Sequence, residues 1–161
     1  MSWFPPKFLL TFLGACAALV GCKGPGQPLE WPRRLPLATL AEGTTSGVRD
    51  ARELLIRDAE SWLLLWTEHA RLGLPPEPAP EIDFSTHMVV ALFGGECPSS
   101  GYEIHALDCC EDDAGVTLRG EHVEPMPGSM QAQYMTTPFS MYTVPIAAGE
   151  FRVEHGVPVA R

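Results

Sequence analysis

The stretch Met88-Val89-Val90-Ala91-Leu92-Phe93-Gly94-Gly95 decides the fold of this chain. Its first six residues are all apolar, and two of them are valines, which favour extended backbone. A strand with one face in water alternates apolar and polar residues, so an unbroken apolar run predicts a central strand that is covered on both faces. The glycine pair ends this strand. The fold must therefore place a layer of structure against each side of residues 88–93.

A helix is predicted upstream of this strand, after Asp58, which is suited to the N-cap position. The apolar residues that follow recur at spacings of three and four, and two leucines widen the apolar face; they are Ala59, Trp62, Leu63, Leu64, Leu65, Trp66 and Ala70. We therefore expect a helix that is mostly buried. Gly73 and the proline-rich residues 74–80 end it. Residues 47–57 are ambiguous, because Leu54-Leu55-Ile56 could end a strand or extend the helix backward.

Downstream of the central strand, the chain alternates apolar and polar residues in several short segments. Strands are expected at residues 102–106, 116–119, 139–146 and 151–153, with an acidic turn at residues 108–115 and a long loop at residues 124–138. One helix followed by a run of antiparallel strands indicates an α+β domain. The expected architecture is one buried helix packed on a mainly antiparallel β-sheet or small β-sandwich.

The N-terminal segment has the layout of a bacterial lipoprotein signal. An apolar run of 13 residues (8–20) leads into Leu19-Val20-Gly21-Cys22, and the run is shorter than the ~20 residues that span a bilayer. We expect residues 1–21 to be the signal peptide, Cys22 to be lipidated, residues 22–43 to form a flexible tether and residues 44–161 to fold as a domain. The protein would then lie in the bacterial cell envelope, anchored to the membrane on its extracytoplasmic side. An ordinary secretory signal and a transmembrane anchor are the alternatives, and Leu13-Gly14-Ala15-Cys16 is a second, poorer lipobox.

The net charge of the chain limits its possible partners. The formal net charge is −9, or −10 once Lys7 leaves with the signal, which disfavours binding to nucleic acid or to anionic headgroups.

Three cysteines remain in the expected domain, namely Cys97, Cys109 and Cys110. A disulfide between Cys97 and either of the other two, or a vicinal Cys109–Cys110 bridge, is left open, because the pairing depends on how the loop at Cys97 folds back.

Several short pieces of the chain, taken in order, resemble a known family. They are Glu60-Ser61-Trp62 with Trp66, Ile82-Asp83-Phe84-Ser85, Met88-Val89-Val90, Gly94-Gly95-Glu96 followed by Ser100-Gly101-Tyr102-Glu103-Ile104, and Pro138-Phe139 with Val144-Pro145-Ile146. Their order and spacing over about residues 45 to 155 are similar to the C-terminal domain of PrcB-type protease-complex subunits. The resemblance implies that residues 44–161 are a small non-enzymatic domain of a kind that is often secreted or lipid-anchored. In the family's namesake setting this domain is the partner of a surface serine-type protease complex, so a secreted or surface protease is a candidate partner here. It carries over no catalytic residue, and the three cysteines are not part of its pattern.

A recognition loop is the leading candidate site. Residues 94–102 contain Gly94, Gly95, Ser99, Ser100, Gly101 and Tyr102, and such a loop allows a partner backbone to approach closely beside a rigid aromatic contact. The alternative is that the glycines only shape a hairpin and Tyr102 packs in the core.

Other chemistries have weaker support. Four methionines fall within 16 residues (Met126, Met130, Met135 and Met141), and with His122 and the cysteines they could hold Cu(I). Methionine is also a common core filler. Asp108, Glu111, Asp112 and Asp113 lack the EF-hand register, and no HExxH or GxSxG pattern occurs. We therefore expect no catalytic residue, resident metal or cofactor.

The sequence thus predicts a membrane-anchored, non-enzymatic protein-binding domain, plausible as a partner of a protease complex. The alternatives are a copper- or redox-handling lipoprotein that uses the Met/Cys set, and a protease inhibitor that presents the loop at residues 94–102.

Overall fold

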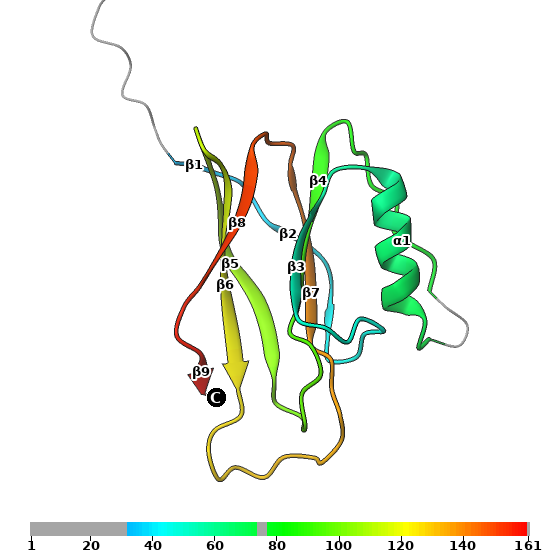
Figure 1. Cartoon of the computed structure of the whole chain (residues 1–161), viewed down its shortest axis with the longest axis vertical. Helices are drawn as coiled ribbons and strands as arrows, with labels where there is room; N and C mark the ends of the chain where they lie inside the picture. The colour runs from blue at the N-terminus through cyan, green and yellow to red at the C-terminus, as the bar shows by residue number, and fades with distance from the viewer. Residues whose placement is uncertain (1–31, 74–76, 161) are drawn as a thin grey trace, which may run out of the picture.

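The computed structural model describes residues 32–73 and 77–160. They form two facing β-sheets, and one helix packs on the side of one sheet that is away from the other sheet (Figure 1). The helix-side sheet has the strand order β2-β7-β4-β3, made of Ala38–Gly43, Phe139–Pro145, His87–Phe93 and Arg52–Ile56. The outer sheet has the order β1-β5-β6-β8, made of Arg33–Arg34, Glu103–Asp112, Gly115–Glu124 and Glu150–His155, and β9 (Val159–Ala160) also pairs with β6. Strand pairing is antiparallel except where β8 and β9 run parallel to β6. The architecture is mainly β with one helix, and the two sheets form a small sandwich.

The prediction for the central strand is confirmed. β4 lies between β3 and β7, and each residue from Met88 to Phe93 is at most 1% exposed. Met88, Val90 and Leu92 face the outer sheet and join the core of the sandwich. Val89, Ala91 and Phe93 face the helix and join a second core. An unbroken apolar run is needed here because both faces of the strand are covered.

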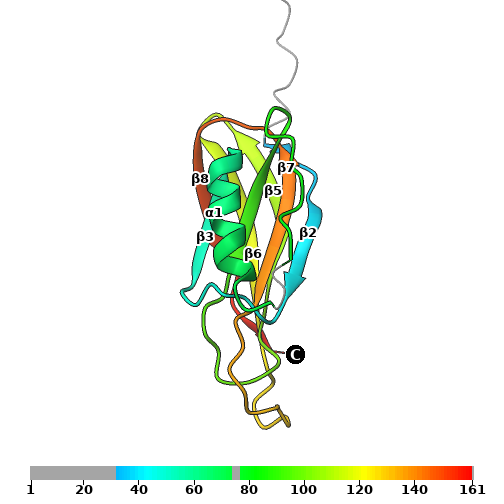
Figure 2. The ribbon, with the colours of Figure 1, turned by 90° about the vertical axis from the view of Figure 1, so that its right-hand side faces the viewer.

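The helix α1 (Ala59–Ala70) begins as predicted. Asp58 caps it, since its Oδ1 accepts a hydrogen bond of 2.8 Å from the backbone N of Ser61. Trp62, Leu65 and Trp66 are buried against the sheet. The expectation of a mostly buried helix is wrong, because Leu63 and Leu64 are 55% and 68% exposed. Figure 2 shows the helix in front of the sheet, so one face packs on the sheet, and no other described helix or strand covers its opposite face.

The predicted acidic turn is also wrong, because the strands on both sides run through it. β5 continues to Asp112 and β6 begins at Gly115, so the turn consists of residues 113 and 114 alone. Asp112 Oδ1 accepts hydrogen bonds from the backbone N of Ala114 (2.8 Å) and of Gly115 (3.1 Å). Gly115 has a φ of +142°, and a Cβ at this position would lie 2.1 Å from the carbonyl oxygen of Glu150. Because glycine has no side chain, the start of β8 at Glu150 can pass directly against this turn.

Arginines from other strands explain why acidic residues remain in a sheet. Arg33 forms an ion pair with Glu111, and both Arg34 and Arg119 lie within 3.4 Å of Asp108. The contacts of Asp108 are on the outer face of the outer sheet, whereas Glu111 pairs with Val116 and is on the side that faces the other sheet. Because arginines on neighbouring strands neutralise the carboxylates of Asp108 and Glu111, residues 108–112 remain in an extended strand.

The folded part begins before residue 44, the start expected from the sequence. Residues 33–43, assigned to the tether, contribute β1 and β2. Leu35 is 3% exposed and packs in the sandwich core, and its backbone N donates to the carbonyl of Cys109 at 2.7 Å. The ambiguous residues 52–56 form β3 and are not helical.

The signal segment and Cys22 lie outside the described residues. Within residues 32–73 and 77–160, no helix has the length and apolar character that a membrane crossing requires.

Candidate functional site

Two connections between the sheets gather at one end of the sandwich. Residues 94–102 link β4 to β5, and residues 125–138 link β6 to β7, so each crosses from one sheet to the other. Figure 1 shows both at the bottom of the molecule, and Figure 2 shows the same end from the side. We call residues 94–102 and 125–138 together the end lobe.

Hydrogen bonds join the two segments of the end lobe to each other. Cys97 and Thr136 exchange backbone hydrogen bonds of 2.8 and 2.9 Å, and the backbone N of Ser100 donates to the carbonyl of Ala132 at 3.0 Å. Thr136 Oγ1, which is buried, donates to the carbonyl of Ser99 at 2.8 Å. Because backbone pairs and side chains both contribute, the lobe holds a defined shape although it has almost no regular strand.

The residues predicted for recognition lie at the base of this lobe. Gly95 and Gly101 have φ values of +77° and +91°, so both need the left-handed conformation that glycine adopts freely. The backbone N of Gly94 donates to the carbonyl of Pro138 at 2.9 Å, and Ser100 Oγ donates to Gln131 Oε1 at 3.0 Å. Ser99 is buried and Tyr102 is half-buried. Polar groups of Gly94, Ser99 and Ser100 are thus engaged with the second segment, whereas the backbone N of Glu96 donates to the carbonyl of Arg49 at 3.0 Å.

The second segment carries the exposed apolar surface. Met130 is fully exposed, and Met126, Tyr134 and Met135 are 56%, 54% and 59% exposed. All four lie within residues 125–138, so this segment is the candidate interaction surface of the domain. The sequence pattern pointed to residues 94–102 and considered these methionines as copper ligands or core fillers, so it missed them as contact surface together with Tyr134. One signal in the sequence could have found this surface. The predicted loop at residues 124–138 contains several large apolar residues that do not alternate as they would in a strand.

Comparison with known families gives one match. A family model described as PrcB C-terminal matches residues 88–145. This match supports a PrcB-type domain at residues 88–145. The matched residues run from β4 to β7 and include both segments of the end lobe. No curated protein and no solved structure matches the chain.

The three cysteines of the PrcB-type domain are free thiols, so the disulfide left open by the sequence is not formed in the structure. Cys97 lies in the end lobe, whereas Cys109 is buried in the sandwich core and Cys110, next on the same strand, is half-buried. Successive residues of a strand point to opposite faces, which separates the two adjacent thiols. Burial raises the pKa of Cys109 to about 12, and burial together with Asp108 raises the pKa of Cys110. Neither thiol is activated as a nucleophile.

The Met/Cys set considered as an alternative copper site is dispersed among the described residues. Met141 is fully buried in the core that faces the helix, while Met126, Met130 and Met135 are exposed on the end lobe. Thioether ligands must surround one ion to hold Cu(I). The three exposed methionines are therefore available for contact with a partner, and Met141 is part of the core.

One serine–histidine contact exists that spacing does not predict. Ser46 Oγ lies 2.9 Å from His69 Nδ1, and the same oxygen accepts a hydrogen bond from the backbone N of Val48. Ser46 is only 1% exposed, and the His69 ring packs edge-on against Phe139 at 4.3 Å between centroids. Burial lowers the pKa of His69. A substrate has no access to this hydroxyl, so the contact joins residues 46–48 to the end of the helix.

Proposed function

We propose that this chain is a membrane-anchored, non-enzymatic domain of the bacterial cell envelope that binds a protein of a protease complex through its end lobe. The observation that carries the proposal is the exposed apolar group of the lobe, Met126, Met130, Tyr134 and Met135. The PrcB-type match, which spans the lobe, points to a protein partner in a protease complex.

The lobe is suited to binding a folded protein. Its backbone is held by cross-segment hydrogen bonds, so little conformational entropy is lost when a partner binds. Tyrosine supplies a rigid contact with a hydroxyl, and methionine side chains adapt to the shape of the opposing surface. Interfaces of this kind draw most of their affinity from a few such residues.

The position of the lobe agrees with an N-terminal anchor. The chain enters the domain at β1, which pairs with the end of β5 next to the 113–114 turn. The end lobe begins at the other end of β5, about 30 Å away for a strand of 10 residues. A lipid on Cys22 would therefore leave the lobe on the side of the domain that is away from the membrane.

The anchor is tested by metabolic labelling with palmitate. Cys22→Ser should abolish incorporation, whereas Cys16→Ser should leave it intact, because residue 16 would be removed with the signal. Equal labelling of Cys22→Ser and the wild type would contradict the anchor.

The partner is tested by affinity capture from detergent-solubilised envelopes of the source bacterium. The wild type should recover a protease, and a lobe variant with Met130→Ser and Tyr134→Ser should lose it. Leu64→Ser is the matched control, since Leu64 is equally apolar and exposed but lies on the helix. Recovery of the same protease by the lobe variant, or of no protease by the wild type, would refute the proposal. Activity of the captured protease with and without this domain separates a stabilising subunit from an inhibitor.

A further inference from the structure

Three polar side chains meet where the apolar core of the sandwich ends. On each of three strands, the side chains that face the space between the sheets come at every second position, and each of these rows ends in a polar residue. On β3, Leu55 is followed by Glu53, and on β8, Val153 is followed by His155. On β6, Leu118 and Gly120 are followed by His122. β3 and β8 are the edge strands of the two sheets. Glu53, His122 and His155 thus converge at the open side of the sandwich, between the two sheets.

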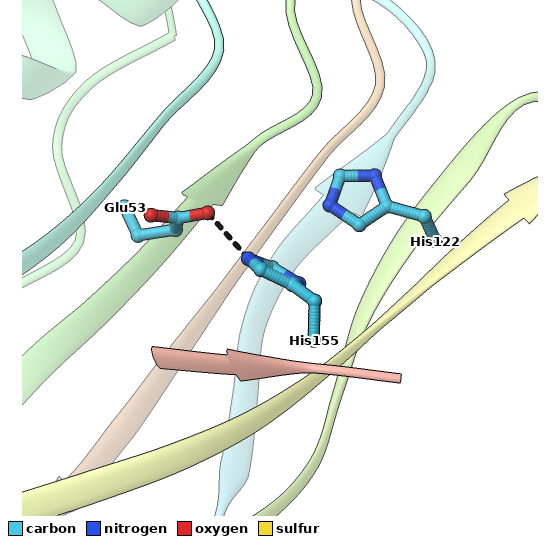
Figure 3. Close-up of side chains that lie close together, drawn as sticks. All are labelled: Glu53, His122 and His155. Atoms are coloured by element: carbon cyan, nitrogen blue, oxygen red, sulfur yellow. Dashed lines mark hydrogen bonds and ion pairs between the residues drawn. The ribbon is translucent and has the colours of Figure 1, made fainter. Parts of the chain in front are cut away.

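The geometry of this cluster is that of potential metal ligands. One ligand atom from each of the three residues lies within 4.8 Å of the other two. His155 Nε2 is 2.6 Å from Glu53 Oε1, and the two imidazole rings are 4.6 Å apart between centroids at an angle of 59°. Figure 3 shows the carboxylate and both rings pointing into one small space from three separate strands. Ligands bound to one tetrahedral ion stand about 3.4 Å apart for bonds of ~2.1 Å, so small side-chain rotations suffice.

A glycine makes room for this arrangement. Gly120 lies opposite His155 in the strand register, and a Cβ on Gly120 would be 2.9 Å from His155 Nδ1 and 3.0 Å from Cε1. Without a side chain at residue 120, the imidazole rests on β6 and turns its Nε2 toward Glu53. The backbone N of Gly156 donates to the carbonyl of Gly120 at 3.3 Å, which fixes the end of β8 beside the cluster.

The cluster combines a carboxylate with two imidazoles and is open to solvent. Burial, and next the neighbouring His155, lower the pKa of His122. The Glu53 carboxylate supplies negative charge, and the Glu53 and His155 side chains are 34% and 29% exposed, which leaves a path for an ion from solvent.

We propose that Glu53, His122 and His155 form a Zn²⁺ site that ties β3 of one sheet to β6 and β8 of the other. Two imidazoles with one carboxylate suit a borderline divalent ion, and Zn²⁺ accepts three protein ligands with water in the fourth position. The bound ion closes the open side of the sandwich, and it leaves the end lobe free for a partner. Spacing in the sequence predicts no such site, because the three residues are far apart in the chain.

The test is a titration of Zn²⁺ into the full chain, purified in detergent and stripped of metal with a chelator. Calorimetry should show one site of micromolar or tighter affinity that His122→Asn, His155→Asn and Glu53→Gln each weaken by at least about tenfold. Co²⁺ should give the intense visible absorption of tetrahedral coordination in the wild type and lose it in the variants. Zn²⁺ should also raise the melting temperature of the wild type but not of His155→Asn.

His105→Asn is the matched control. His105 Nε2 lies 2.9 Å from Glu103 Oε2, so it is a histidine–carboxylate pair of the same kind outside the cluster. It should retain wild-type Zn²⁺ affinity. Every variant keeps all the cysteines, so differences among them report on the cluster. Gly120→Ala, which changes no ligand, should weaken binding by displacing His155. Zn²⁺ affinity that is unchanged in all three ligand variants, or reduced as much by His105→Asn, would overturn the proposal.

Discussion

The substitution Leu35→Ala tests whether residues 33–43 belong to the folded domain. The side chain is 3% exposed and packs in the sandwich core between the two sheets. The backbone hydrogen bond from Leu35 to Cys109 does not depend on the side chain, so the alanine variant keeps it. The substitution therefore isolates the packing of one side chain on a segment that the sequence assigned to a tether.

The expected loss is worked out from the carbon atoms removed. Three buried carbons at ~0.8 kcal/mol each give about 2.4 kcal/mol of lost hydrophobic transfer. A cavity adds to this, but β1 has only two residues at the margin of a sheet, so partial collapse keeps the total near 3 kcal/mol, within the range of Leu→Ala changes. With an m value of about 1.5 kcal/mol per M, the urea midpoint falls by about 2 M.

The assay is urea unfolding followed by the fluorescence of Trp62 and Trp66, both on the buried face of the helix. Arg34→Ala is the control: its side chain is 79% exposed and its ion pair with Asp108 is 3.4 Å long. We expect that variant to stay within about 0.5 kcal/mol of the wild type. A Leu35→Ala midpoint within about 0.3 M of the wild type would refute the reasoning, because residues 33–43 would then contribute nothing to folding.

Three further predictions follow from local geometry. Gly115→Ala should cost more than about 3 kcal/mol in chemical denaturation, because its Cβ would overlap the Glu150 backbone, while Gly128→Ala, also at positive φ but in open space, should cost about 1 kcal/mol. The free energy of unfolding should be at its full value above the ordinary histidine pKa of 6.5. It should fall as the pH drops from there to the lowered folded-state pKa of His69, because the unfolded chain takes up the proton first. His69→Gln should make this fall shallower, and an unchanged slope would contradict the role of His69. Iodoacetamide at pH 8 should label Cys110 and Cys97 before Cys109, and mass spectrometry that finds Cys109 labelled first in folded protein would contradict its burial.

The sequence predicted those features that depend on short-range patterns. The run at residues 88–93 indicated a strand covered on both faces, and that burial is observed on β4. Asp58 indicated the start of the helix, and it caps α1. The alternating segments at residues 139–146 and 151–153 correspond to β7 and β8 within two residues at each end. In each case the signal lay within about a dozen neighbouring residues, where side-chain period and capping act directly.

The features that were missed depend on partners distant in the chain. Residues 108–112 looked like a turn because they are acidic, but Arg33, Arg34 and Arg119 neutralise them from other strands. Leu63 and Leu64 looked buried because they are apolar, but only one helix face meets the sheet.

By itself, then, the sequence determined the central strand, the helix start and the alternating strands, since period and capping are local properties. Only the tertiary structure decided that β1 and β2 join the sheets, that the loops at residues 94–102 and 125–138 pair into one lobe, and that Glu53, His122 and His155 meet at one point. The physical reason is that strand pairing and sheet packing bring together residues separated by tens of positions. No pattern of neighbouring side chains records which of those residues will face one another.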